Sequence, residues 1–139
     1  SNILNKKSGF LGVSGISNDS RDIMEACKQG NPRAILANKI FIRRIADFIG
    51  QYFVRLGGCD LLVFSAGIGE NSAETREQIV DAIKEALGVE IDRELNYKLH
   101  GVESLISTKD SKIKIAIIPT DEEVMIARDA YSLTIGANK

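Results

Sequence analysis

The sequence predicts an α/β fold in which helices alternate with short strands, and three features predict it. Apolar residues recur at helical spacing over 34–56. Two short apolar runs, at 60–66 and 112–118, end in glycine or proline turns. A capped helix start follows each run, which is typical of strands joined by helical crossovers.

Composition limits the function before any motif is considered. The 139 residues are enough for one domain with a core, and 44% are hydrophobic. Lysine and arginine (18) nearly balance aspartate and glutamate (19), so nucleic acid is not an expected partner. No apolar run approaches the roughly 20 residues that span a bilayer, so no membrane partner is expected. Ser1 and Asn2 could be the remnant of a removed tag.

The first half of the chain predicts one loop and two helices. Residues 7–22 are rich in Gly, Ser, Asn and Asp and predict a loop. A helix should follow over 21–30, and a second should run over 31–56 with Pro32 at its first helical position. The apolar stripe of the second helix is wide, so this helix is expected to be largely buried.

The middle of the chain predicts a strand followed by two helices. Residues 60–66 form a short apolar run flanked by glycine, which favours a buried strand over a helix. Asn71 and Glu74 have the spacing of a capping box, although Asn replaces the usual Ser or Thr. The helix that they begin should end at Gly88, and a shorter helix should cover 92–100.

Two strands and a helix are expected in the last third. Strands at 102–107 and 112–118 are separated by a polar turn. Thr120 and Glu123 form a cleaner capping box, which predicts a final helix that begins after Thr120. His100 is the only histidine, so Ser-His-Asp and Cys-His chemistry have no support.

The segment 61–72, LLVFSAGIGENS, is the sharpest candidate site. Gly67 and Gly69 follow a strand and precede a helix, where backbone can approach a ligand. Ser72 stands where a dinucleotide fingerprint needs a third glycine, and Glu70 would repel phosphates. The neutral adenine and ribose end of a nucleotide suits this turn better. A tight strand–helix turn without a ligand is the alternative.

An acidic turn at 119–123, PTDEE, also follows a strand and opens a helix. Its carboxylates could hold Mg²⁺, because hard cations prefer oxygen ligands. They could instead only complement the helix dipole. Arg76 is expected to be a solvated helix residue, with a place in the same cleft as the alternative.

A third candidate is the segment 18–21, Asn-Asp-Ser-Arg. Asp19 or Ser20 could simply cap the next helix in an Asx-type turn. Arg21 could instead reach a phosphate or stack on a base.

Three segments, SGFLGVSGISNDSRD, FSAGIGENSAETR and IPTDEEVMIARD, resemble segments of the acetate kinase (acetokinase) family in order and separation. The resemblance implies that 1–139 is the single C-terminal nucleotide-binding domain fragment of a longer two-domain kinase. The implied fold is part of a ribonuclease-H-like, actin-like ATPase domain with a mixed sheet flanked by helices. The implied nucleotide contacts are Gly67, Ile68, Gly69, Glu70, Asn71, Asp19, Ser20 and Arg21.

The resemblance also implies chemistry. Family members transfer a phosphoryl group between ATP and acetate, which gives ADP and acetyl phosphate, with Mg²⁺ (or Mn²⁺) as the cofactor. Glu122 matches the family's metal-associated glutamate, although the family more often has Asn at the position of Asp121. The catalytic residues are expected outside this chain, so none is assigned here and the chain alone should be inactive. A cytoplasmic homodimer is the implied state of the full-length enzyme.

Three alternatives remain open at this stage. One is a propionate or butyrate kinase of the same family, since the acyl pocket that distinguishes them is expected elsewhere. Another is a non-catalytic ATP-binding module of the same superfamily. The last is a fragment that binds no ligand.

Overall fold

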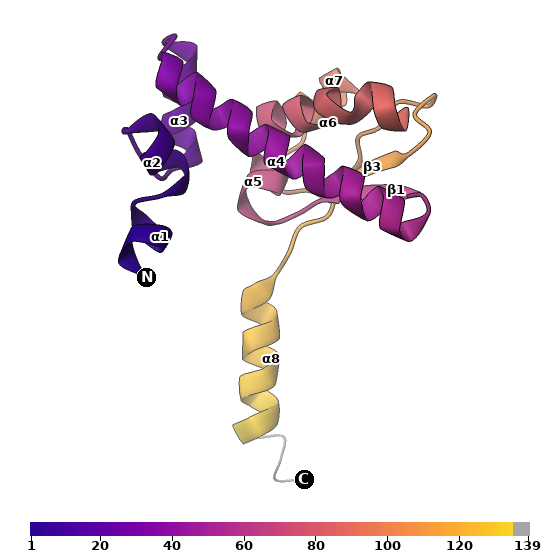
Figure 1. The fold of residues 1–139 in the computed structure, drawn as a ribbon. Helices are drawn as coiled ribbons and strands as arrows, with labels where there is room; N and C mark the ends of the chain where they lie inside the picture. The colour runs from indigo at the N-terminus through magenta and orange to yellow at the C-terminus, as the bar shows by residue number, and fades with distance from the viewer. Residues whose placement is uncertain (135–139) are drawn as a thin grey trace.

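A computed structural model describes residues 1–134, which form eight helices and three strands (Figure 1). The elements in chain order are α1 (Asn2–Lys6), α2 (Gly9–Ser14), α3 (Ser20–Lys28), α4 (Pro32–Leu56), β1 (Leu61–Phe64), α5 (Ala66–Asn71), α6 (Ala73–Leu87), α7 (Arg93–Lys98), β2 (Ser104–Leu105), β3 (Lys114–Ile117) and α8 (Glu122–Thr134).

The sheet is small and mixed, in the order β1-β3-β2. β1 runs parallel to β3, with Leu61 opposite Lys114 and Phe64 opposite Ile117. β2 is antiparallel to β3, with Leu105 opposite Ala116. A parallel pair requires a crossover, and α5, α6 and α7 supply it. The predicted α/β class with a mixed sheet flanked by helices is therefore confirmed.

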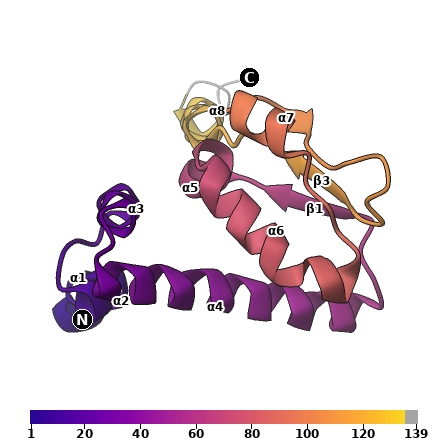
Figure 2. The same ribbon diagram turned by 90° about the horizontal axis from the view of Figure 1, so that it is seen from above.

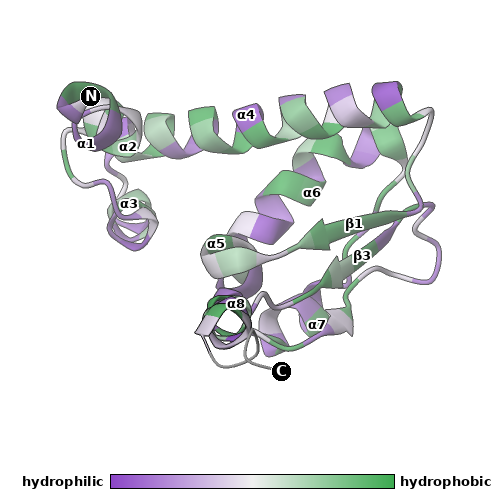
Figure 3. Ribbon diagram, turned by 90° about the horizontal axis from the view of Figure 1, so that it is seen from below, coloured by the Kyte–Doolittle hydropathy of each residue, from purple (hydrophilic) through white to green (hydrophobic). Residues whose placement is uncertain are grey.

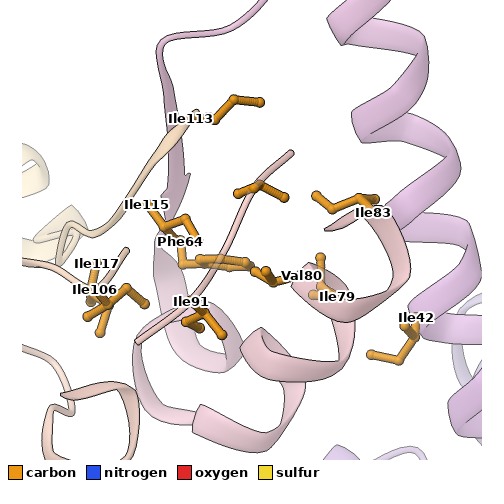
Figure 4. Close-up of a cluster of buried hydrophobic side chains, with 11 residues drawn as sticks. Ile42, Phe64, Ile79, Val80, Ile83, Ile91, Ile106, Ile113, Ile115 and Ile117 are labelled. Atoms are coloured by element: carbon orange, nitrogen blue, oxygen red, sulfur yellow. The ribbon is translucent and has the colours of Figure 1, made fainter. Parts of the chain in front are cut away.

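The core lies between this sheet and α6 (Figure 4). Ile79, Val80 and Ile83 of α6 are buried against Phe64 of β1 and Ile115 of β3. Ile113, Ile115 and Ile117 recur at every second position, so they share the face of the strand that is packed on α6. The two strands whose carboxyl ends carry the candidate sites are thus fixed to one rigid layer.

Helix α4 forms a long bar along one side of the molecule (Figure 2). Its first turn is capped by Asn31, whose side chain accepts hydrogen bonds from two backbone N–H groups, and Gly57 ends it with φ +73°. The helices α2 and α3 pack on α4 near its start, and α6 packs farther along. α4 therefore sets the distance between α3 and the body that carries α5.

The expected burial of α4 was wrong. Only Ala34, Ala37 and Ile42 are buried among its residues. Several large apolar side chains of this helix are exposed instead: Leu36, Ile40, Phe48, Tyr52, Val54 and Leu56. The apolar stripe of α4 is thus wider than the surface that α2, α3 and α6 cover. Hydrophobic residues, in green, lie along this helix in Figure 3.

The strand β1 also differs from its prediction. It was expected to be buried, but Leu61 and Val63 are 42% and 41% exposed while Phe64 is buried. The described residues therefore leave one face of β1 partly uncovered. The strand expected at 102–107 is reduced to the two residues of β2.

Two segments expected to be irregular are helical. The predicted loop at 7–22 contains α2, which ends at Gly15 with φ +72°. The Gly-Ile-Gly-Glu-Asn turn forms α5, so the following helix α6 is capped by Ser72 and not by Asn71. The Ser72 hydroxyl accepts from the Thr75 N–H at 3.3 Å. Propensity missed both helices because each is short and glycine-rich.

Helix α8 projects away from the rest of the molecule, and none of its residues is buried (Figure 1). Its predicted capping box was wrong. The Asp121 side chain, and not that of Thr120, accepts from the Val124 N–H at 2.9 Å. Within residues 1–134, no helix combines the length and apolar character that a membrane crossing requires.

Candidate functional site

The turn after β1 is shaped by one strained residue and one glycine. Ser65 is extended, Ala66 has φ +56°, and α5 begins there, so the chain reverses sharply at the strand end. A Cβ on Gly69 would lie 3.3 Å from the Phe64 carbonyl carbon. Gly69 therefore lets α5 sit close against the end of β1.

Gly67 has no such structural reason. A Cβ at this position would meet nothing within 4 Å, and Gly67 is not among the glycines with positive φ. Its missing side chain keeps the surface open on the outer side of the turn. An open surface at a strand end is where ligands bind in open α/β sheets.

A cleft of about 620 Å³ lies between α3 and this turn. It brings together the two predicted nucleotide segments, since Asp19, Ser20 and Arg21 line one side and Gly67, Ile68 and Asn71 line the other. Figure 2 shows α3 and α5 on the same side of α4. The volume falls in the range of about 300–1,000 Å³ that small-molecule sites occupy.

The α3 side of the cleft is a helix start with an attached ion pair. Asp19 is the N-cap, and its Oδ1 accepts from the Arg21 N–H at 2.8 Å. Its Oδ2 lies 2.6 Å from Nη2 of Arg21. These bonds from Arg21 lower the pKa of Asp19 to about 2 and raise the pKa of Arg21. The cleft therefore presents a charged pair and a capped helix start.

The α5 side is held by its own side-chain amide. Nδ2 of Asn71 donates to the Gly67 carbonyl at 3.0 Å, across the turn. No described hydrogen bond uses Oδ1 of Asn71, a residue that lines the cleft. Ile68 adds an apolar surface on which a ring could pack.

Glu70 and Gly69, two other predicted nucleotide contacts, do not line this cleft. The Glu70 carboxylate accepts from the backbone N–H of Thr120 at 2.8 Å and from its hydroxyl at 3.1 Å. The Thr120 N–H is the largest cause that lowers the pKa of Glu70. Glu70 thus ties α5 to the acidic turn, and its role as a nucleotide contact stays a prediction.

The acidic turn forms a second hollow of about 480 Å³, which also includes Ala66, Gly67 and Glu70. Glu122 lies there with Asp121 and Glu123. Among residues 1–134, no group of three or more His, Cys, Asp or Glu side chains is arranged to hold a metal. Mg²⁺ in kinases is held by one or two carboxylates together with substrate phosphates. The assignment of Glu122 to a metal stays a prediction.

The burial of Arg76 differs most from its prediction. It was expected to be solvated, but it is fully buried in α6. Its hydrogen bonds reach the carbonyls of Gly69 and Glu70 within the turn. The signal was present in the spacing, because Arg76 falls on the same helical face as Ala73, Val80 and Ile83.

The fold and the turn together define a mixed α/β protein with its candidate site at strand ends. Comparison with protein families narrows the class. The model of the acetokinase family matches residues 1–128, so the chain belongs to the acetokinase family.

Sequence relatives agree with this assignment. The chain is 49% identical over 133 residues to an acetate kinase of Bacteroides thetaiotaomicron and covers 33% of its length. It is 57% identical over 128 residues to an acetate kinase of Halothermothrix orenii and covers 32% of it. These alignments include 96% and 92% of the chain. The chain thus spans about a third of the length of the relatives it matches.

Solved structures extend the likeness to three dimensions. An acetate kinase of Porphyromonas gingivalis superposes with a TM-score of 0.83 at 45% identity, over 92% of this chain and 32% of that one. A propionate kinase of Francisella tularensis gives 0.81 at 40% identity, over 91% and 31%. Both acyl specificities therefore occur among proteins with this fold.

Proposed function

We propose that this chain is the nucleotide-binding part of an acetate kinase, which converts ATP and acetate to ADP and acetyl phosphate. One observation carries the proposal: a single cleft joins Asp19, Ser20 and Arg21 to Gly67, Ile68 and Asn71. Family membership supports this reaction, and the geometry of the cleft supports this location for the nucleotide.

Different residues of the cleft would contact different parts of the nucleotide. Gly67 and Ile68 offer an open, partly apolar surface that suits adenine and ribose. The Oδ1 of Asn71 can accept a hydrogen bond from an amino or hydroxyl group. On the opposite side, Arg21 can turn from Asp19 toward a phosphate, because its side chain is 88% exposed.

Glu122 would hold the metal from the far side of the turn. Mg²⁺, or Mn²⁺, supplies charge neutralisation on the transferring phosphoryl group when it is bound. Glu122 contributes one oxygen, and the Glu70–Thr120 bonds keep the start of the acidic turn next to α5. Nucleotide and metal would therefore bind on adjoining surfaces of one structural unit.

The whole reaction needs more than these residues. Phosphoryl transfer depends on several positioned groups acting together, and this chain spans about a third of its relatives. We assign no catalytic residue to this chain. We propose the acetate site, the cytoplasmic location and the homodimer only for the full-length enzyme. With ATP and acetate, the 139-residue chain should form no acetyl phosphate, and measurable turnover would contradict this assignment.

A propionate kinase is the second candidate. The structural match to the Francisella tularensis propionate kinase favours it specifically. None of the cleft residues contacts an acyl group in the proposed arrangement. Competition between acetate and propionate in the full-length enzyme would separate the two candidates.

An NMR titration of the chain with MgADP tests the proposed site. Amide signals of residues 19–21 and 67–71 should shift together, and Arg21→Gln should weaken binding by roughly tenfold through a lost charge-assisted bond. Arg43→Gln is the matched control, since Arg43 is 83% exposed and also pairs with an aspartate, but on α4. Shifts confined to other surfaces would contradict the proposed cleft.

A further inference from the structure

Arg76 is a buried guanidinium whose hydrogen bonds are complete. All five of its N–H groups donate. Nη1 reaches the carbonyls of Gly69 and Glu70 at 2.9 and 2.8 Å. Nη2 reaches the carbonyls of Asn96 and Leu99 at 2.9 and 3.1 Å, and Nε reaches Oδ1 of Asn96 at 2.7 Å.

These acceptors lie at the ends of two short helices, α5 and α7. The carbonyls of Gly69 and Glu70 lie in the last turn of α5, where backbone acceptors have no partner within the helix. Those of Asn96 and Leu99 lie at the end of α7. α5 contains no buried residue, so hydrophobic packing does not hold it. Arg76 thus joins two helix ends, and a cation suits both.

The side chain of Asn96 orients the guanidinium of Arg76. This side chain is fully buried, and its Nδ2 donates to the Ala73 carbonyl at 3.0 Å while its Oδ1 accepts from Arg76. Arg76 has no carboxylate partner among the described ion pairs, and burial lowers its pKa. A buried charge paired only with neutral groups is costly. An apolar side chain would fill α6 at lower cost but would leave the α5 carbonyls without these donors.

We infer that Arg76 is a positioning residue that holds the Gly67–Asn71 turn in its nucleotide-accepting shape. The inference rests on the proposed function for the ligand, and on the hydrogen bonds for the mechanism. Because Glu70 is held through its carbonyl and also binds Thr120, the same contact sets where the acidic turn lies relative to the cleft.

Arg76→Lys separates positioning from charge. Lysine keeps the positive charge, but its three N–H donors all project from a single nitrogen. They cannot reach the carbonyls of α5 and α7 at the same time. Amide hydrogen exchange should accelerate at least tenfold at Glu70, Asn71 and Ser72, with little change in β1 and β3, since only local contacts are lost. The Kd for MgADP should rise roughly tenfold. Arg93→Lys is the control, because Arg93 is an exposed arginine that pairs with Glu77 and Asp81.

The outcomes distinguish this role from a merely structural one. Faster amide hydrogen exchange throughout the molecule would overturn the inference. An unchanged Kd for MgADP, measured at a temperature where Arg76→Lys is folded, would also overturn it. If Arg76→Lys does not fold, Asn96→Ala decides, because it removes one acceptor and leaves the carbonyl contacts. It should give the same local exchange pattern at smaller size. A wild-type chain that binds no MgADP would refute the proposed function, and the exchange pattern would still show whether Arg76 holds the turn.

Discussion

At the residue scale, Asp19 shows how one side chain can serve both the fold and the site. It caps α3 through the Arg21 N–H and forms an ion pair with the guanidinium of the same residue. Both contacts favour the carboxylate over the carboxylic acid. The cleft side of α3 therefore depends on the charge of Asp19.

A carboxyl titration tests this dependence. The pKa of Asp19 is lowered from 3.8 to about 2 in the folded chain. A lowered folded pKa gives a contribution to stability that is present above pH 3.8 and is lost as the pH falls through 2. NMR of the Asp19 side chain should show a midpoint near 2, and Arg21→Gln should move it upward. A midpoint near 3.8 in the wild-type chain would contradict the observed ion pair.

Single residues also show what sequence reasoning reaches and what it misses. A glycine at position 69 was expected to let the backbone approach a ligand, whereas the structure shows that its Cβ would crowd Phe64. The side-chain partner of Glu70 was not predictable. Its contact with Thr120 joins residues that are far apart in sequence, and only the β1–β3 pairing brings them together. Likewise, the charge of Arg76 led us to expect an exposed side chain, although its spacing along the helix indicates a buried position.

At the scale of elements, the regular helices and strands follow from hydrophobic periodicity. α4, α6, β1 and β3 all lie where apolar spacing placed them, because each is long or strongly patterned. α2 and α5 do not follow from propensity. Tertiary contacts hold these short helices, α2 against α4 and α5 through the guanidinium of Arg76.

Gly88, which ends α6, gives an element-scale prediction. Its φ is +64°, and a Cβ there would lie 2.7 Å from Cδ of Lys112. Gly88→Ala should lower the free energy of unfolding by about 1 kcal/mol or more, since alanine is strained at positive φ. Denaturant unfolding measures the change.

Gly50 is the matched control for that substitution. It lies inside α4, where φ is not positive and a Cβ would meet nothing within 4 Å. Gly50→Ala should raise the free energy of unfolding by roughly 0.5–1 kcal/mol, because alanine favours helix. Equal effects of the two substitutions would show that backbone conformation does not control the α6 end.

At the scale of the whole molecule, the described residues leave apolar surface uncovered. β1 is an edge strand with Leu61 and Val63 exposed, and α4 exposes Phe48 and Tyr52 among others. Helix α8 adds Ile126 and further exposed apolar side chains. A flat apolar edge is a template for pairing with another chain.

The 139-residue chain should therefore self-associate as its concentration rises. Sedimentation velocity should show a rising mean mass, and Val63→Lys should reduce it because a lysine blocks an edge strand. Gln51→Lys, which adds the same charge to an exposed position of α4, should have less effect. A single monomeric species at all concentrations would contradict the expectation.

Calorimetric titration with MgADP is the most direct test that this chain carries a nucleotide site. The wild-type chain should bind, and Asn71→Ala should bind roughly tenfold more weakly, because it removes the bond to Gly67 and the amide group of a residue that lines the cleft. Asn38→Ala, which removes an amide bonded to Gln78 on the α4–α6 contact, should bind like the wild type. The absence of binding heat at several temperatures, in a sample that circular dichroism shows to be folded, would contradict the site.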